Sequence, residues 1–228
     1  MVSKKFFQML SLIIAAAFSA AAASAQTAGE KSGLKKDDGL GIYIIRTESG
    51  YLIVHNREKD SYSIEFRGSK FDPHEGEHPI FTIDDKLVQI VSVANNNYWK
   101  PKGNAKNEPT DTELLEAHKI WESEYLGGEL KAKLSVTSEI FDIERSRKVM
   151  FWSFPMPKAL GSDFSHQIFL TTLVNKNIIA LNASPKSSGD QKTYREYLVE
   201  SMNSLKISAK PFNVKELQEL LKKGDLVD

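Results

Sequence analysis

The segment that most constrains the fold is the run Val149-Met150-Phe151-Trp152-Ser153-Phe154, which ends at Pro155-Met156-Pro157. Apolar residues occupy both alternating positions of this run, so a strand formed here must be covered on both of its faces. A strand of this kind lies inside a sheet, with further material packed above and below it. The run therefore predicts a layered fold with a sheet in the middle.

Other short segments have strand character and are separated by turn residues. We expect strands at residues 41–45, 51–54, 62–66, 80–83, 87–93, 134–141, 167–174 and 178–183. The last two form a hairpin around residues 175–177. The connections in the first half of the chain are too short for crossover helices, so neighbouring strands there pair in the antiparallel direction.

Three segments have the features of amphipathic helices. The first begins at Thr110, where Glu113 completes a capping box, and ends at Gly127-Gly128. The second extends from a cap at Asp190 to residue 205, and the third follows a cap at Asn213. Helices packed on an antiparallel sheet indicate an α+β fold, a layered α/β/α sandwich.

The N-terminus has the three parts of a secretory signal peptide. Lys4 and Lys5 precede an apolar stretch at residues 6–22, and small residues follow at residues 23–25. This pattern predicts cleavage before Gln26 and a periplasmic or secreted mature chain. A retained membrane helix is the alternative, but no basic stop-transfer cluster follows the apolar stretch.

Composition limits the remaining possibilities. The chain of 228 residues has no cysteine, which excludes a disulfide scaffold and a thiol nucleophile, and export without disulfides favours a bacterial setting. Thirty basic residues balance thirty acidic ones, so the chain lacks the basic surplus typical of nucleic-acid binding. We expect a flexible lead at residues 26–39, one domain at residues 40–208, and a C-terminal helix at residues 209–228 docked on that domain.

One short motif has catalytic potential. His74-Glu75-Gly76-Glu77-His78 matches H-E-x-x-H, in which two histidines on one helical turn bind zinc and the glutamate activates water. Pro73 and Pro79 bracket the motif, and strands are predicted on both sides. We therefore interpret it as a solvated loop without a cofactor. The alternative is a zinc-dependent hydrolase that uses His74, Glu75 and His78.

A long loop at residues 95–109 is the leading candidate binding segment. Tyr98 and Trp99 stand beside Lys100 and Lys102. Aromatic rings next to lysines can stack on a sugar or bind an acidic partner. The alternative interpretation is that Trp99 only anchors the loop to the core.

The order of elements resembles the PsbP/Mog1-like superfamily. The matching features are the opening meander, the helix at residues 110–126, the strands Phe169-Leu170-Thr171-Thr172-Leu173-Val174 and Ile178-Ile179-Ala180-Leu181, and the closing helix before Ile207. The resemblance covers residues 40–208 and implies a layered α/β/α sandwich that acts as a non-enzymatic accessory module. It carries no shared catalytic motif, so it assigns no functional residue.

These observations favour an exported, non-catalytic module that binds a protein or a cell-envelope component, and no nucleic acid. The zinc-dependent hydrolase is one alternative. The other is a carrier of an apolar small molecule, with Phe151, Trp152 and Phe154 lining its pocket. We expect no membrane-spanning segment in the mature chain.

Overall fold

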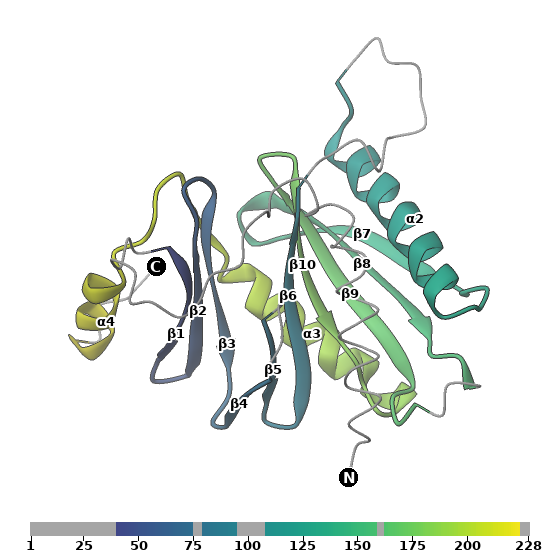
Figure 1. The fold of residues 1–228 in the computed structure, drawn as a ribbon, viewed down its shortest axis with the longest axis horizontal. Coiled ribbons are helices and arrows are strands. Elements are labelled where there is room, and N and C mark those ends of the chain that lie inside the picture. Colours follow the sequence, from purple (N-terminus) through teal and green to yellow (C-terminus); the bar gives the residue numbers. More distant parts are fainter. Residues whose placement is uncertain (1–39, 75–78, 95–107, 159–161, 224–228) are drawn as a thin grey trace, which may run out of the picture. The chain divides into compact units, whose positions relative to one another are not determined.

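The structure is a computed structural model that describes residues 40–74, 79–94, 108–158 and 162–223 (Figure 1). Within these ranges the chain forms two compact units. Unit 1 consists of the described residues of Asp72–Val199, and unit 2 of those of Thr27–Phe71 and Glu200–Asp228. The chain passes from unit 2 to unit 1 within one strand and returns within one helix.

Unit 2 is built on a four-stranded antiparallel sheet with the strand order β1-β2-β3-β11 (Figure 1). Its strands are β1 (Gly41–Arg46), β2 (Gly50–Asn56), β3 (Ser61–Arg67) and β11 (Lys206–Ser208). The first three confirm the predicted strands. Helix α4 (Val214–Lys223) follows Asn213, whose side-chain Oδ1 accepts a hydrogen bond from the Glu216 backbone N–H at 3.3 Å, as the predicted cap requires.

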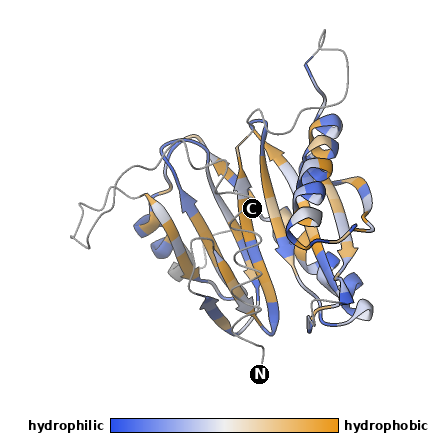
Figure 2. Cartoon of the chain, turned by 45° about the vertical axis from the view of Figure 1, so that its right-hand side comes forward, coloured by the Kyte–Doolittle hydropathy of each residue, from blue (hydrophilic) through white to orange (hydrophobic). Residues whose placement is uncertain are grey.

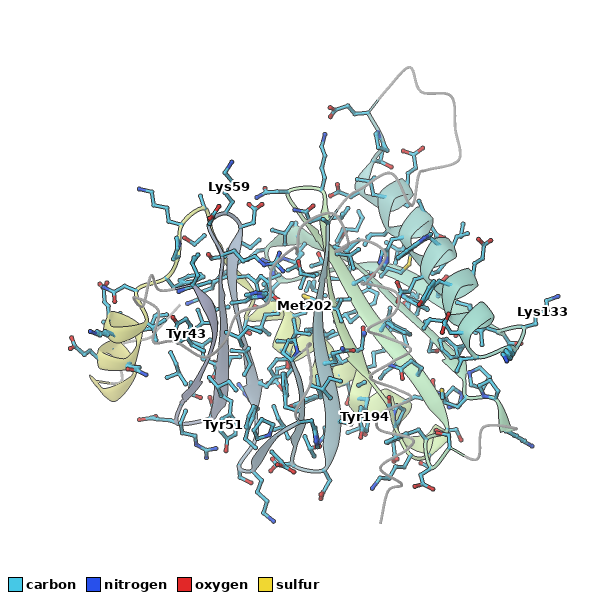
Figure 3. The ribbon with its side chains drawn as sticks, in the orientation of Figure 1. Tyr43, Tyr51, Lys59, Lys133, Tyr194 and Met202 are labelled. Carbon is cyan, nitrogen blue, oxygen red and sulfur yellow. The ribbon has the colours of Figure 1, made fainter. Side chains whose placement is uncertain are left out.

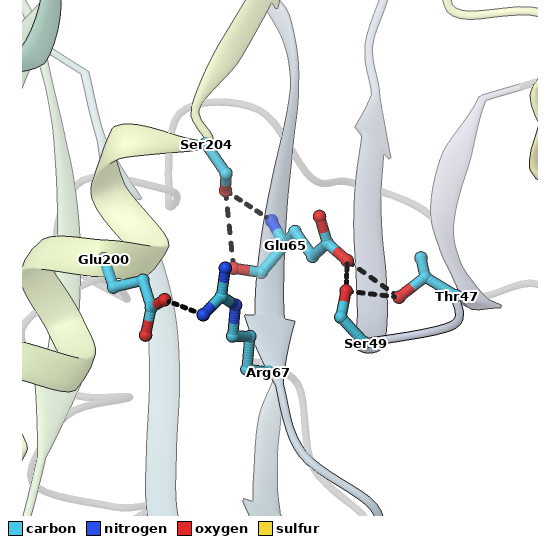
Figure 4. Close-up of polar contacts among 6 residues, drawn as sticks. All are labelled: Thr47, Ser49, Glu65, Arg67, Glu200 and Ser204. Carbon is cyan, nitrogen blue, oxygen red and sulfur yellow. Dashed lines mark hydrogen bonds and ion pairs between the residues drawn. The ribbon is translucent and has the colours of Figure 1, made fainter. Parts of the chain in front are cut away.

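Side-chain hydrogen bonds connect the strands of unit 2 to the end of helix α3 (Gln191–Asn203). Ser204 Oγ lies 2.7 Å from the backbone nitrogen of Glu65, and the Glu65 carboxylate accepts hydrogen bonds from the hydroxyl groups of Thr47 and Ser49 (Figure 4). The guanidinium group of Arg67 pairs with the Glu200 carboxylate at 2.6 Å. Polar side chains therefore link the turn before β2, strand β3 and the helix end.

Unit 1 is built on a seven-stranded antiparallel sheet with the strand order β4-β5-β6-β10-β9-β8-β7 (Figure 1). Its strands are β4 (Phe71–His74), β5 (Ile80–Ile83), β6 (Lys86–Val93), β7 (Thr137–Ile143), β8 (Arg147–Pro155), β9 (His166–Val174) and β10 (Asn177–Ala183). All of these except β4 were predicted. Strand β4 is short and contains a proline, so its sequence pattern is weak.

Helices cover both faces of the seven-stranded sheet. Met150, Trp152 and Phe154 on β8 pack in one core cluster with the leucines of helix α2 (Asp111–Glu129). Phe151 has the opposite orientation on the strand, and its ring lies under the guanidinium group of Arg195 on α3. Unit 1 is therefore a layered α/β/α sandwich, which confirms the predicted fold class. Figure 2 shows that the strands of this sheet are mainly hydrophobic, whereas α2 carries a mixture of both kinds of residue.

Helix α2 begins as predicted but ends later. Thr110 Oγ1 accepts a hydrogen bond from the Glu113 backbone N–H, and the Glu113 carboxylate accepts one from the Thr110 backbone N–H, so the capping box is present. The helix continues through Gly127 and Gly128, the predicted end. It ends only after Glu129, because the backbone N–H of Leu130 still donates to the carbonyl of Leu126 at 2.9 Å.

Candidate binding site

Only one part of the H-E-x-x-H motif lies within the described residues. His74 ends the extended strand β4, and its Nε2 atom is 2.8 Å from Thr82 Oγ1 on β5. Glu75 and His78 lie outside the described residues. Within the part of the chain that the structure describes, no three His, Asp or Glu side chains converge in the way a metal ion requires. The interpretation as a loop without a metal, and the alternative of zinc binding by His74 and His78, therefore both stay predictions.

The predicted binding loop also falls outside the described residues. Tyr98, Trp99, Lys100 and Lys102 belong to residues 95–107, so their role as a binding surface stays a prediction.

The structure separates the three aromatic residues that were expected to line an apolar pocket. Trp152 stacks on Phe169 with 3.7 Å between ring centroids, and both Trp152 and Phe154 are completely buried. Phe151 lies on the other face of the sheet, below Arg195. The alternation of side chains along a strand causes this separation, so the three rings cannot line one pocket.

A charged hollow of about 290 Å³ opens at the start of helix α3. The turn between β5 and β6 and the segment that leads into α3 supply its lining, which consists of Asp84, Asp85, Lys86, Lys186, Asp190, Thr193 and Tyr194. We call this feature the Tyr194 hollow. The sequence pattern does not indicate this hollow, because its two segments lie about one hundred residues apart along the chain.

Local backbone geometry positions the carboxylates of the hollow. Asp84 and Asp85 both have positive φ angles, 44° and 66°, in the tight turn that joins β5 to β6. Aspartate is among the residues that tolerate positive φ angles, which suits both positions to this turn. On the other side, the Asp190 carboxylate accepts a hydrogen bond from the Ser187 backbone N–H at 3.2 Å. Asp190 was predicted to cap α3 itself. It directly precedes the first residue of the helix, which is the position of the predicted cap, and it also closes the 3₁₀ turn Ser188–Asp190.

Tyr194 is the buried member of the hollow. Its side chain lies on the first turn of α3 and is only 8% exposed (Figure 3). Burial, together with the negative charges of Asp190 and Asp85, raises the pKa of the Tyr194 phenol to about 12. The hydroxyl group is therefore neutral at physiological pH and lies within the field of two carboxylates.

A second polar group lies beneath helix α2. His118 and Glu122 are one turn apart on its buried face and are 2% and 4% exposed, with 3.9 Å between Nε2 and Oε2. Burial raises the pKa of the Glu122 carboxyl group to about 7 and lowers that of the His118 imidazole to about 3. The sequence spacing of Leu114, His118, Trp121 and Tyr125 predicts an apolar face of this helix that includes His118 and omits Glu122. The spacing of Leu114, His118, Glu122 and Leu126 was the signal that could have found it.

Comparisons with known proteins show a likeness in fold. No protein-family model matches the chain, and no curated protein matches it in sequence. Among solved structures, the chain is similar to cyanobacterial PsbP (CyanoP) from Synechocystis sp. PCC 6803, determined in solution. The match covers 79% of this chain and 98% of that one, with 11% identity and a TM-score of 0.41. None of the described helices has the length and apolar character of a membrane span.

Proposed function

We propose that this chain is an exported, non-catalytic accessory module that binds a protein of the cell envelope through the Tyr194 hollow. The signal-peptide pattern at residues 1–25 supports export, with cleavage before Gln26. The observation that carries the binding role is the hollow itself, whose volume is close to that of small ligand sites.

The chemistry of the lining supports binding over catalysis. The residues that line the hollow supply carboxylates, ammonium groups and hydroxyl groups, and they include no histidine, serine or cysteine. Opposite charges placed around a concave surface give specificity to an association with a complementary partner.

Site-specific photo-crosslinking in the envelope of the native host tests this proposal. Thr193→p-benzoylphenylalanine places the reactive group in the lining of the hollow, and the same change at exposed Lys133 (Figure 3) provides the position control. We expect one defined adduct from position 193 and none from position 133. Sequencing of the mature N-terminus, expected at Gln26, tests export separately.

A second experiment tests whether the yield of this adduct depends on the negative charges of the hollow. The double substitution Asp85→Asn/Asp190→Asn keeps the size of both side chains and removes both charges. We expect it to reduce the adduct at position 193 at least fivefold. An adduct of unchanged yield in this variant, or equal adducts at both positions, would contradict binding through the hollow.

A further inference from the structure

Two buried amide side chains contact each other across the seven-stranded sheet of unit 1. Gln89 on β6 and Asn182 on β10 lie directly opposite in the register and are 3% and 4% exposed. Asn182 Nδ2 donates to Gln89 Oε1 at 3.4 Å, whereas Gln89 Nε2 and Asn182 Oδ1 have no hydrogen-bond partner in the part of the chain that the structure describes. Buried polar atoms in proteins are nearly always satisfied by protein or by ordered water, so both atoms require an explanation.

The two unsatisfied atoms are of opposite kinds, because Gln89 Nε2 is a donor and Asn182 Oδ1 is an acceptor. Exchanging nitrogen and oxygen in both amides keeps this balance, since Gln89 Oε1 then becomes the unsatisfied acceptor and Asn182 Nδ2 the unsatisfied donor. Exchanging them in one amide alone would bring two donors or two acceptors into contact. The pair therefore requires one group that both accepts and donates a hydrogen bond, whichever way the amides are turned.

A cavity of about 10 Å³ lies beside this pair. Gln89 and Asn182 line it together with two further polar side chains, Gln167 and Ser184, and with the apolar residues Ile80, Leu87, Val88 and Ala183. Ser184 Oγ donates to Gln167 Oε1 at 2.7 Å, so these two side chains bind each other. A volume of this size holds a single water molecule and excludes a larger ligand.

We propose that one ordered water molecule occupies this cavity, where it accepts a hydrogen bond from Gln89 and donates one to Asn182. Water supplies both kinds of hydrogen bond, and two polar partners are the minimum that holds a buried water molecule. An ammonium ion only donates and would leave Gln89 Nε2 unsatisfied, and a halide ion only accepts and would leave Asn182 Oδ1 unsatisfied. The site shares no lining residue with the Tyr194 hollow, so it is independent of the proposed function.

NMR on the isotope-labelled mature chain tests the proposal through magnetisation transfer from water to side-chain amide protons. We expect cross-peaks of opposite sign in the NOE and ROE experiments at Gln89 and Asn182, which is the signature of a water molecule that tumbles with the protein. Gln218, an exposed amide on α4, is the matched control and should lack this signature. Absence of the signature at both buried amides of the wild type would overturn the inference.

A nearby hydroxyl proton that exchanges with solvent gives a similar signal, and Ser184 is the hydroxyl that lines the cavity. Ser184→Ala removes this proton, and the cross-peaks at Gln89 should persist. Their loss in this variant would assign them to the hydroxyl group and overturn the inference.

Further variants connect the water molecule to named atoms. Asn182→Leu leaves one polar partner of the pair, fewer than a buried water molecule needs, so the cross-peaks at Gln89 should disappear. Gln218→Met should leave them unchanged, and cross-peaks that survive Asn182→Leu would contradict the proposed bridge. Diffraction from wild-type crystals provides a measurement that needs no variant. It should show one density peak within hydrogen-bonding distance of both amides, whereas a peak that contacts only oxygen atoms or only N–H groups would identify an ion and overturn the inference.

Discussion

The two units differ in how completely the hydrogen-bonding groups of their buried polar side chains are satisfied. In unit 2, the buried amide of Asn56 donates to the Phe212 carbonyl and accepts from the Phe212 backbone N–H, each at 2.8 Å. Buried Ser61 donates to the Arg57 carbonyl and accepts from the Arg57 backbone N–H. In unit 1, four side chains have buried polar atoms without a hydrogen-bond partner in the described structure, namely Gln89 Nε2, Glu122 Oε2, Trp152 Nε1 and Asn182 Oδ1.

This difference shows which polar groups stabilise the fold and which weaken it. A satisfied buried hydrogen bond adds a modest amount of stability, whereas a buried atom without a partner carries its full desolvation cost. All four side chains lie on the side of the seven-stranded sheet that α2 covers. Glu122 belongs to α2 itself. Gln89, Asn182 and Trp152 lie on the facing side of the sheet, where they are linked through Phe169 as cross-strand neighbours. These unsatisfied atoms therefore offset part of the stability that apolar packing provides under α2.

The largest expected effect is the pH dependence that the buried side chains Glu122 and His118 give to unit 1. The pKa of Glu122 rises from the ordinary 4.5 to about 7 on folding, so its contribution to stability is complete below pH 4.5 and is lost as pH rises through 7. The loss amounts to about 3 kcal/mol. We expect the free energy of unfolding of Glu122→Gln, minus that of wild type, to increase with pH over this window, measured by urea denaturation.

His118 should give a pH dependence of stability with the opposite sign, which makes the test more specific. Its pKa is lowered from 6.5 to about 3, so its contribution is present above pH 6.5 and is lost as pH falls toward 3. The stability of His118→Gln, relative to wild type, should therefore increase as pH falls. Exposed Glu124→Gln is the matched control and should give a flat difference curve. A flat curve for Glu122→Gln as well would mean that burial does not perturb this carboxyl group.

The next effect concerns a satisfied group in unit 2. Asn56→Ala removes both hydrogen bonds to Phe212. The backbone N–H and carbonyl of Phe212 then lose these partners. We expect the free energy of unfolding to fall by about 2 kcal/mol, measured by urea denaturation at pH 7. Gln218→Ala, an exposed amide on α4, should change it by less than about 0.5 kcal/mol. A similar small change for Asn56→Ala would erase the contrast between the units.

The amide pair of unit 1 should respond differently from Asn56. Asn182 Nδ2 donates to Gln89 Oε1 at a long 3.4 Å, and both side chains line a cavity of about 10 Å³. Asn182→Leu alone leaves Gln89 wholly without a partner and should cost about 1–2 kcal/mol. Adding Gln89→Met removes both amides, so the double variant should recover most of this loss in a double-mutant cycle. If the losses of the free energy of unfolding from the two single substitutions add in the double variant, removing both amides brings no recovery, and the expectation is contradicted.

Sequence patterns could predict most elements of the fold but few of the contacts in the site. Residues 62–66 and 149–154 predict their strands because the hydrophobic period is local and strong. Strand β11 escaped prediction because three residues, two of them exposed, carry no usable period. The Tyr194 hollow escaped because Asp85 and Tyr194 are brought together only by the tertiary fold. The burial of Glu122 was not predicted, because a charged residue is rarely fully buried. Trp121 and Tyr125 were expected on the buried face of the helix in its place. Both of those rings are only half-buried.

The smallest expected effect compares one helix cap in each unit. Thr110 and Glu113 form a reciprocal box at the start of α2, whereas Asn213 caps α4 through a single hydrogen bond of 3.3 Å. Thr110→Ala should lower the free energy of unfolding by about 1 kcal/mol and Asn213→Ala by about half as much, measured by urea denaturation at pH 7.

The hydrogen bond from the Thr110 backbone N–H lowers the pKa of the Glu113 carboxyl group. The part of the cap that Glu113 supplies is therefore present above the ordinary pKa of this group and is lost in acid. The difference between the free energies of unfolding that the two substitutions remove should therefore become smaller at low pH. Equal costs at every pH would mean that the reciprocal hydrogen bond to Glu113 adds nothing to the stability of α2.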